Sequence, residues 1–315
     1  MRFPLRFLCF NRSRLQAGTE DGDRKNRIIG LLGLLLATAL LQACATVKIA
    51  YNQAPDLAYW YLDGYMDFDG AQSTQLRNDL AKLQTWHRQT ELQGYIDALQ
   101  KWQAKLPDEL DAAHACEIFS DVRRKLVAVS GQAEPAAAAL VGTLSAAQLA
   151  QLENKFSKIN AEYREAYLEA APKASRNKRY KQAVSRAHML YGQLEEPQLA
   201  EIGLAIDQSR FDAALSYAEW QRRQRDALQT LRTIVALGPA APNQRETTRV
   251  AVRGLFGRWL NSPDAGYRLY ADALTQDSCK SFSRFHNSTS AAQRRHAVKT
   301  LVGYEQDLKA LLAKN

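Results

Sequence analysis

Apolar residues recur at three- and four-residue intervals along most of the chain, the spacing of one face of an α-helix. The clearest run is Leu149, Leu152, Phe156, Ile159, Tyr163, Ala166 and Ala170, which predicts a helix over residues 145–170. A second run, from Leu76 to Trp102, predicts one long helix over residues 70–103 with Gly94 as a candidate bend. No stretch shows the apolar/polar alternation that is typical of a strand.

The same pattern predicts further helices, separated by proline and glycine. They are expected around residues 118–129, before a break at Gly131–Pro135, and then from Glu195, over 211–237, 243–260, 264–285 and 290–313. Low glycine and proline content and many Ala, Leu, Gln and Arg residues support helices throughout. We therefore expect an all-α fold, a multi-helix bundle of long amphipathic helices with short connections.

Two expected helix starts have the same four-residue form. Ser145–Gln148 and Ser290–Gln293 match a capping box, in which the serine hydroxyl accepts from one free backbone N–H and the glutamine reaches back to another. Asp69–Gln72 and Glu195–Gln198 are looser versions of this pattern. Leu144–Gln148 is also similar to the short Leu-Thr-x-x-Gln motif of Spy/CpxP-type periplasmic chaperones. The ordinary interpretation is that these boxes stabilise helix ends.

The N-terminal stretch has the layout of a bacterial lipoprotein signal peptide. Arg24, Lys25 and Arg27 precede about 14 apolar residues, too few for the roughly 20 that cross a bilayer, and Leu41-Gln42-Ala43-Cys44 follows. We expect residues 1–43 to be removed and Cys44 to be lipidated, which anchors the protein on the periplasmic side of the cell envelope. Ala45 after the cysteine favours the outer membrane. Residues 44–50 would be a tether and 51–315 a single helical domain, with a candidate internal boundary at 238–242.

Removal of residues 1–43 leaves a mildly basic chain of 272 residues with 35 basic and 30 acidic side chains. Basic clusters lie at 173–186, 222–225 and 294–296. In a periplasmic protein the available polyanions are envelope polymers, anionic lipid and unfolded proteins, so nucleic acid is not an expected partner. Solvated helix faces are the ordinary explanation of such charge.

Aromatic residues are dense just after the tether. Tyr59, Trp60, Tyr61 and Tyr65 stand within seven residues, following Pro55. One interpretation is a helix buried against the rest of the fold, and the other is a partner-binding groove or a belt at the membrane interface close to the lipid.

Two cysteines, Cys116 and Cys279, would remain in the processed domain. Because the periplasm oxidises exposed thiol pairs, we expect a disulfide between them that holds the end of the chain against its first half. The alternative is that both are small buried residues on different faces.

Catalytic patterns are missing from the sequence. The five histidines, at positions 87, 114, 188, 286 and 296, are scattered without metal-ligand spacing, and no nucleophile elbow, phosphate loop or dinucleotide fingerprint occurs. We therefore expect no cofactor, no metal site and no enzymatic activity.

Several short motifs resemble an uncharacterised family of proteobacterial lipoproteins, a domain of unknown function. They are Ala50–Pro55, Tyr61–Tyr65, Trp86-His87 and His286-Asn287-Ser288-Thr289, together with the cysteine motif at 41–44. The resemblance covers essentially the whole processed chain. It implies a single helical periplasmic domain and assigns no activity.

These observations favour a lipid-anchored periplasmic binding or envelope-maintenance protein that presents a groove or basic face to envelope proteins, unfolded clients or anionic polymers. Binding of unfolded clients would make it chaperone-like. A structural or assembly subunit of an envelope complex is the alternative, and an enzyme of unknown class is third.

Overall fold

The computed structural model describes residues 46–238 and 243–313. The expected signal peptide, Cys44, Ala45 and most of the 238–242 linker lie outside the described residues. The described residues from Val47 onward form one compact unit.

The described part is all-α, which confirms the predicted fold class. Its elements are α2 (Thr46–Asn52), α3 (Ala54–Met66), α4 (Gly70–Thr90), α5 (Leu92–Lys105), α6 (Ala112–Val141), α7 (Ala146–Tyr163), the π-helical turn η1 (Arg164–Leu168), α8 (Pro172–Tyr191), α9 (Glu196–Asp207), α10 (Ala213–Leu237), α11 (Gln244–Leu260), α12 (Ala265–Asn287) and α13 (Ala291–Leu312). Connections between the described helices are short.

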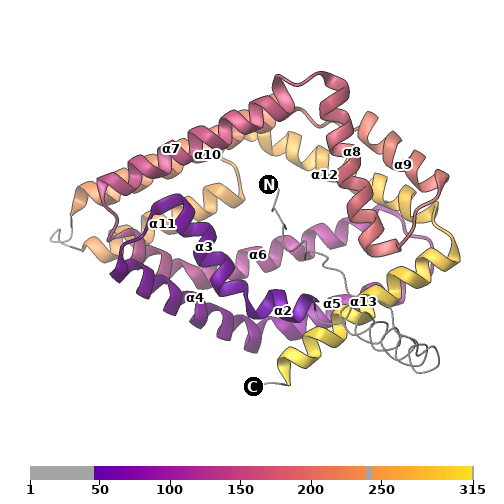
Figure 1. The fold of residues 1–315 in the computed structure, drawn as a ribbon, viewed down its shortest axis with the longest axis horizontal. Coiled ribbons are helices and arrows are strands. Elements are labelled where there is room, and N and C mark those ends of the chain that lie inside the picture. Colours follow the sequence, from indigo (N-terminus) through magenta and orange to yellow (C-terminus); the bar gives the residue numbers. More distant parts are fainter. Residues whose placement is uncertain (1–45, 239–242, 314–315) are drawn as a thin grey trace, which may run out of the picture. The chain divides into compact units, whose positions relative to one another are not determined.

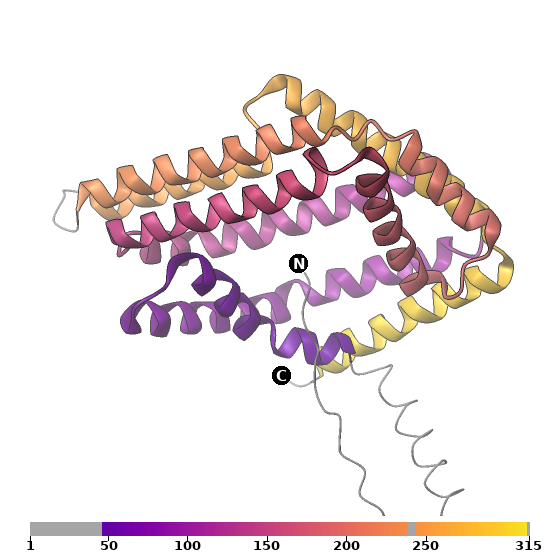
Figure 2. The ribbon, with the colours of Figure 1, turned by 45° about the horizontal axis from the view of Figure 1, so that its top comes forward.

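Helix α6 packs against α4, α11 and α12, while α7 lies along α10 and α5 along α13 (Figures 1 and 2). The largest buried cluster joins residues of α5, α8, α9, α12 and α13, among them Trp102, Tyr191, Ile202 and Phe285. A second cluster joins α7 to α10 through Leu149, Leu152, Phe156, Leu228 and Leu231. The apolar faces seen in the sequence therefore meet one another in pairs.

The predicted helix over residues 70–103 is two helices. The break falls at Glu91, three residues before Gly94. It turns Leu92 and Ile96, each 1% exposed, toward Leu308 and Leu311 of α13. Gly94 does not form the bend but leaves room for Lys125, which pairs with Glu91. A Cβ at position 94 would lie 2.5 Å from the Lys125 Nζ.

The predicted break at Gly131–Pro135 is wrong, because α6 continues through both residues. A proline inside a helix removes one backbone hydrogen bond. Packing on both sides of the position holds the helix together: Ala138 is buried with Ile234 and Val252, and Glu134 accepts two hydrogen bonds of 2.8 Å from the Arg253 guanidinium. At the next helix, the expected continuation to residue 170 ends in η1 instead.

The capping glutamines do more than cap. All four expected boxes form their reach-back bond, with the side-chain oxygens of Gln72, Gln148, Gln198 and Gln293 accepting from the N–H of the cap residue three positions earlier. The glutamines also pair across helices. Gln148 donates to the Gln72 side-chain oxygen at 2.6 Å, and Gln293 donates to that of Gln198 at 3.1 Å.

Each glutamine also donates to a backbone carbonyl at the start of its partner helix. That carbonyl always belongs to the residue two before the partner's cap: Thr143 for Gln72, Asp67 for Gln148, Ser288 for Gln198 and Gln193 for Gln293. Phe68 and Leu144, next to the carbonyls that the Gln72–Gln148 pair uses, line an apolar groove, and we call this pair the groove-end clasp. The Gln198–Gln293 pair lies at the end of α12, whose Cys279 is bonded to Cys116, and we call it the disulfide-end clasp. Each clasp joins two helix N-termini that are far apart in sequence.

Candidate functional site

Helix α3 divides the predicted aromatic residues between its two sides. Tyr59 is 9% exposed and its hydroxyl lies 3.0 Å from the Ser73 hydroxyl of α4. The Arg77 guanidinium covers the Tyr59 ring at 3.5 Å from its centroid. Tyr59 therefore belongs to the packing between α3 and α4.

Trp60 and Tyr61 lie on the outer side of the same helix. Trp60 is 76% exposed and Tyr61 53%, beside exposed Leu57. We call Leu57, Trp60 and Tyr61 the aromatic face of α3. An indole left this open to water is unusual for a residue whose burial is worth several kcal/mol, so the face is a candidate contact surface.

Tyr65 is intermediate between packed Tyr59 and the exposed residues of the aromatic face. Its ring meets Phe156 edge-on at 6.3 Å, and its hydroxyl lies 3.0 Å from that of Tyr61. Burial, followed by the Tyr61 contact, raises the pKa of Tyr65 above its ordinary value. It anchors the aromatic face to α7.

An apolar groove of about 830 Å³ opens between α3, α4 and α6. Three helices make most of its walls, and α10 and α11 close one side. The main wall residues are Leu62 and Met66 of α3, Phe68 just after α3, Leu76, Leu80 and Leu83 of α4, Ala133, Ala136, Ala139 and Leu140 of α6, Leu231 of α10, and Leu255 and Phe256 of α11. Ala133, Ala136 and Ala139 recur at three-residue intervals on one side of α6, and their single methyl groups leave space between the longer side chains of the wall. The volume is within the range of ligand-binding cavities in proteins.

Polar groups are few in this groove. The charged residues that line it are Asp79 and Lys82, whose charged atoms lie 3.5 Å apart, and Gln75 and Gln132 provide amides. Such a lining favours an apolar guest and offers little for acid–base chemistry. Sequence analysis missed this groove, because its alanines read as ordinary helix formers and its walls come from segments up to about 190 residues apart.

Strong carboxylate pairs lie elsewhere. Glu219, 4% exposed, accepts from Arg222, Arg223 and the Ser262 hydroxyl. Although burial raises the pKa of the Glu219 carboxyl, the arginine hydrogen bonds outweigh it and the net pKa is lowered. These groups hold helices together and do not line the groove.

The predicted disulfide is present. Cys116 of α6 and Cys279 of α12 are bonded, with Cα atoms 5.1 Å apart and a sequence separation of 163 residues. The His286–Thr289 motif begins two turns after Cys279, at the end of the same helix. His286 is fully buried, with Nδ1 2.7 Å from the Tyr191 hydroxyl and Nε2 2.8 Å from the Asp108 carbonyl oxygen. Burial lowers the pKa of His286 below its usual value.

Asn287 completes this arrangement. Its side-chain oxygen accepts from the Leu110 N–H at 2.9 Å and its amide donates to the Leu110 carbonyl at 3.0 Å. The motif thus fastens the α12–α13 turn to the connection between α5 and α6. Its function here is structural.

The other quoted motifs also meet. Tyr51 of α2 places its hydroxyl 3.1 Å from His87 Nδ1 of α4, and Arg88 donates to the Asn52 side-chain oxygen at 3.1 Å. These contacts hold α2 on α4.

Within residues 46–238 and 243–313, no group of three or more His, Cys, Asp or Glu side chains has the proximity to hold a metal ion. None of the helices in this described part is both long and apolar enough to span a bilayer.

The model of a family of unknown function, DUF6279, matches residues 64–236. The chain belongs to this family. The matched region of this DUF6279 protein begins inside α3 and ends at the end of α10, so it includes the α4 and α6 walls of the groove. No curated protein and no solved structure shows a significant match to the chain.

Proposed function

We propose that this DUF6279 protein is a membrane-anchored binding protein of the cell envelope that holds apolar segments of other polypeptides in the groove between α3, α4 and α6. The observation that carries the proposal is the groove itself, about 830 Å³ with almost wholly apolar walls. An apolar segment of an incompletely folded envelope protein would lose its contact with water there. Such binding is chaperone-like and serves envelope maintenance.

The proposed anchor is lipid on Cys44. Helix α2 begins at Thr46, two residues further along the chain, and the aromatic face of α3 follows within the next fifteen. Tryptophan and tyrosine are favoured at the boundary between lipid and water because their rings are amphipathic. We infer that the aromatic face rests on the periplasmic surface of the membrane, the outer membrane on the evidence of Ala45.

The Cys116–Cys279 disulfide supports this location. Structural disulfides form and persist in oxidising compartments such as the periplasm and are rare in the bacterial cytosol.

Client binding is tested by aggregation suppression. At near-stoichiometric amounts the full chain should suppress the aggregation of a chemically denatured client. Ala139→Trp, which fills the groove from an exposed position on α6, should abolish the suppression. Ala218→Trp, at an exposed position on α10 outside the groove, is the matched control. Equal activity of the two variants would contradict the groove as the client site.

Anchoring is tested separately. Cys44→Ser should leave a heavier, unprocessed precursor and abolish incorporation of labelled fatty acid. Normal processing of this variant would remove the lipoprotein assignment and leave the groove proposal standing.

A second function is favoured by a different observation. Phe119, Val122 and Leu126 form an exposed apolar ridge on α6, each between 43% and 55% exposed, at the spacing of one helix face. Contiguous exposed apolar surface of this kind marks protein–protein contacts. We propose assembly into an envelope complex as the alternative role. It predicts one defined partner in cross-linked cells that is lost in Val122→Glu and retained in Ala139→Trp.

A further inference from the structure

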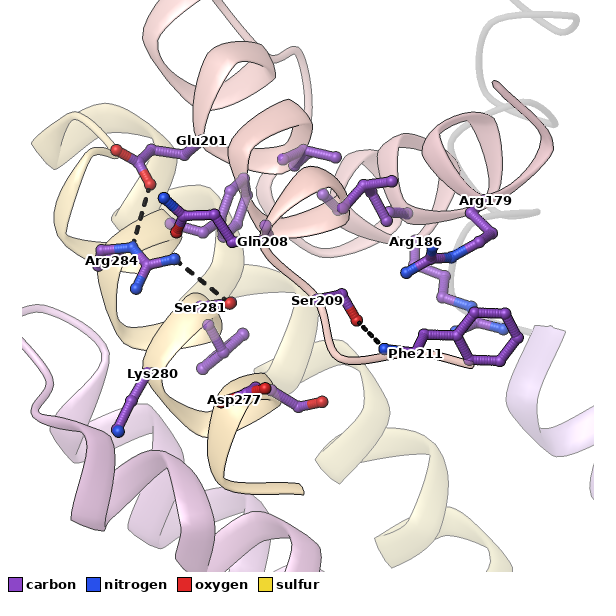
Figure 3. Close-up of a pocket in the computed structure, with 18 of the residues that line it drawn as sticks. Arg179, Arg186, Glu201, Gln208, Ser209, Phe211, Asp277, Lys280, Ser281 and Arg284 are labelled. Carbon is purple, nitrogen blue, oxygen red and sulfur yellow. Dashed lines mark hydrogen bonds and ion pairs between the residues drawn. The ribbon is translucent and has the colours of Figure 1, made fainter. Parts of the chain in front are cut away.

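A second cavity, of about 550 Å³, lies between α8, α9 and α12, and the proposed client site does not use it (Figure 3). Helix α9 packs against both α8 and α12 and covers the space between them. The walls of this cavity differ in character from its rim.

The walls are apolar. Ala183 and Ala187 stand one turn apart on α8, Ile202 comes from α9, and Phe282 and Phe285 come from α12. Because the α8 positions are alanines, the space between α8 and α12 stays open. A chain of methylene groups would lose its contact with water along this wall, which favours its binding there.

The rim is basic. Arg179 and Arg186 lie on the same side of the cavity, two turns apart on α8, and Lys280 comes from α12 (Figure 3). Within the described parts of the chain, no carboxylate lies within the 4.0 Å of an ion pair from any of these three cationic groups. The two acids of the lining are already matched, Glu201 by Arg284 at 3.5 Å and Asp277 by Arg210 at 3.2 Å.

Arg179 is held in place before any ligand arrives. Its guanidinium lies over the Phe211 ring, 4.5 Å from the centroid. Burial lowers the pKa of Arg179 below its ordinary value, so its positive charge is poorly compensated by solvent. An anion bound between Arg179 and Arg186 would supply that compensation and would accept charge-assisted hydrogen bonds.

We propose that this cavity binds an anionic amphiphile with a single alkyl chain, its carboxylate or phosphate head between Arg179 and Arg186 and its chain along Ala183, Ala187 and Phe282. Charge and polarity both select this class. An uncharged lipid leaves the rim unpaired, and a free anion leaves the apolar wall empty.

The chain's own segments fit less well. Residues 1–43 carry seven basic and three acidic side chains, so their charge has the same sign as the rim. The acyl groups expected on Cys44 carry no charge. An external amphiphile is therefore the better match.

The test uses the full-length chain and hexadecanoic acid that carries a photoreactive diazirine on its tail, with the methyl ester of the same probe as the uncharged control. Mass spectrometry of the cross-linked peptides identifies the binding site directly. The position of the label does not depend on how much of the probe partitions into detergent or membrane. We expect labelling of α8 and α12 by the acid, at least tenfold above that by the ester. Competition by unlabelled hexadecanoate and by lysophosphatidic acid distinguishes carboxylate from phosphate heads, and butyrate and inorganic phosphate, which lack the chain, should not compete.

Arg179→Gln/Arg186→Gln should reduce the labelling by the acid at least tenfold. Arg123→Gln/Arg225→Gln removes the same charge at exposed positions outside the cavity and should change nothing. Ala139→Trp, which fills the client groove, should also leave the labelling intact, so failure here is separate from failure of the client proposal. Equal labelling by acid and ester, an unchanged signal in the double variant, or loss of signal in Ala139→Trp would each overturn the proposal.

Discussion

The two glutamine clasps are built alike but sit in different surroundings. In each, two capping glutamines accept from their own cap residue and donate to the carbonyl two residues before the partner's cap. At the disulfide end both glutamines are buried, Gln198 at 2% and Gln293 at 7% exposed. At the groove end Gln72 is buried, while Gln148 is only half-buried.

What surrounds each clasp differs more. The disulfide-end clasp adjoins buried His286 and the hydrogen bonds of Asn287 to Leu110, and the Cys116–Cys279 bond lies two turns before His286 along α12. The groove-end clasp adjoins Phe68, Leu76 and Leu144, which line the apolar groove. The disulfide end thus has a disulfide and a fully buried histidine in addition to its clasp, whereas the groove end has the larger and more apolar of the two cavities. Because binding surfaces are commonly found in regions of low local stability, we expect the groove end to be the less stable of the two.

Removing the disulfide should have the largest effect and should act on the fastened end. Cys116→Ser/Cys279→Ser releases a loop of 163 residues, and the chain-entropy model gives a loss of about 5 kcal/mol for a loop of this size, with measured losses of about 2–5. Chemical denaturation of oxidised wild type and the double variant measures it. An unchanged unfolding midpoint would show that the packing around His286 suffices to hold this end.

Two double-mutant cycles, one for each clasp, should show that the disulfide-end clasp contributes more to the unfolding free energy than the groove-end clasp. Gln198→Ala and Gln293→Ala leave buried carbonyls and cap N–H groups without partners, and each should lose about 2–4 kcal/mol of unfolding free energy. Gln72→Ala and Gln148→Ala should lose about 1–2 kcal/mol, because Gln148 is half-buried and water can reach the groups that this pair would leave unpaired. Coupling energies from the cycles should follow the same order. Equal coupling at both ends would mean that burial does not decide the strength of the clasp.

A matched glycine pair tests the backbone beside each clasp. Gly192 and Gly142 each stand directly before a carbonyl that a clasp uses, yet Gly192 has φ +74° and ψ −145°, and Gly142 is helical with φ −65°. Gly192→Ala should lose about 1–3 kcal/mol, because this backbone conformation belongs to glycine and the new Cβ would lie 3.2 Å from the His296 ring. Gly142→Ala should change stability by less than about 1 kcal/mol, since only the flexible Gln244 amide lies close. Thermal unfolding of both variants gives the comparison, and a Gly192→Ala protein as stable as Gly142→Ala would contradict it.

The two clasps also show which features of the fold the sequence predicts and which it does not. Helical periodicity predicts the fold class, and the four cap motifs predict helix starts, because both depend on residues close together in the chain. The Gln72–Gln148 and Gln198–Gln293 pairs join positions 76 and 95 residues apart, which no local pattern indicates. The local pattern likewise predicts a break at Gly131–Pro135, because the contacts with Arg253 and Ile234 that hold α6 together come from residues about 100 or more positions away. In the candidate site, the aromatic residues of α3 stand out in the sequence, but their division into packed Tyr59 and exposed Trp60 depends on where α4 lies.

The smallest effect we predict is a dependence on pH that differs between the two ends. Burial lowers the pKa of both His286, near the disulfide, and His87, which holds α2 on α4, below the ordinary value. A folded-state pKa below the unfolded value of about 6.5 means that the unfolded chain binds the proton more readily, so stability falls as pH drops below about 6.5. Because His286 is fully buried and His87 only half-buried, His286 should account for more of this fall.

The measurement compares melting temperatures at pH 7.5 and 5.0 for wild type, His286→Gln and His87→Gln. Groups that face His286 are the Tyr191 hydroxyl, the Asp108 carbonyl, Arg294 and Glu109, and the nearby arginine adds to the effect of burial. Carboxylates such as Glu305, whose pKa its hydrogen bonds with Lys309, Gln103 and Gln100 lower to about 2, lose their contribution only as pH falls below about 4.5, outside this interval. The fall in melting temperature between pH 7.5 and pH 5.0 should therefore be reduced most in His286→Gln. A fall as large as that of wild type in this variant would show that protonation of His286 does not cause the pH dependence of this end of the fold.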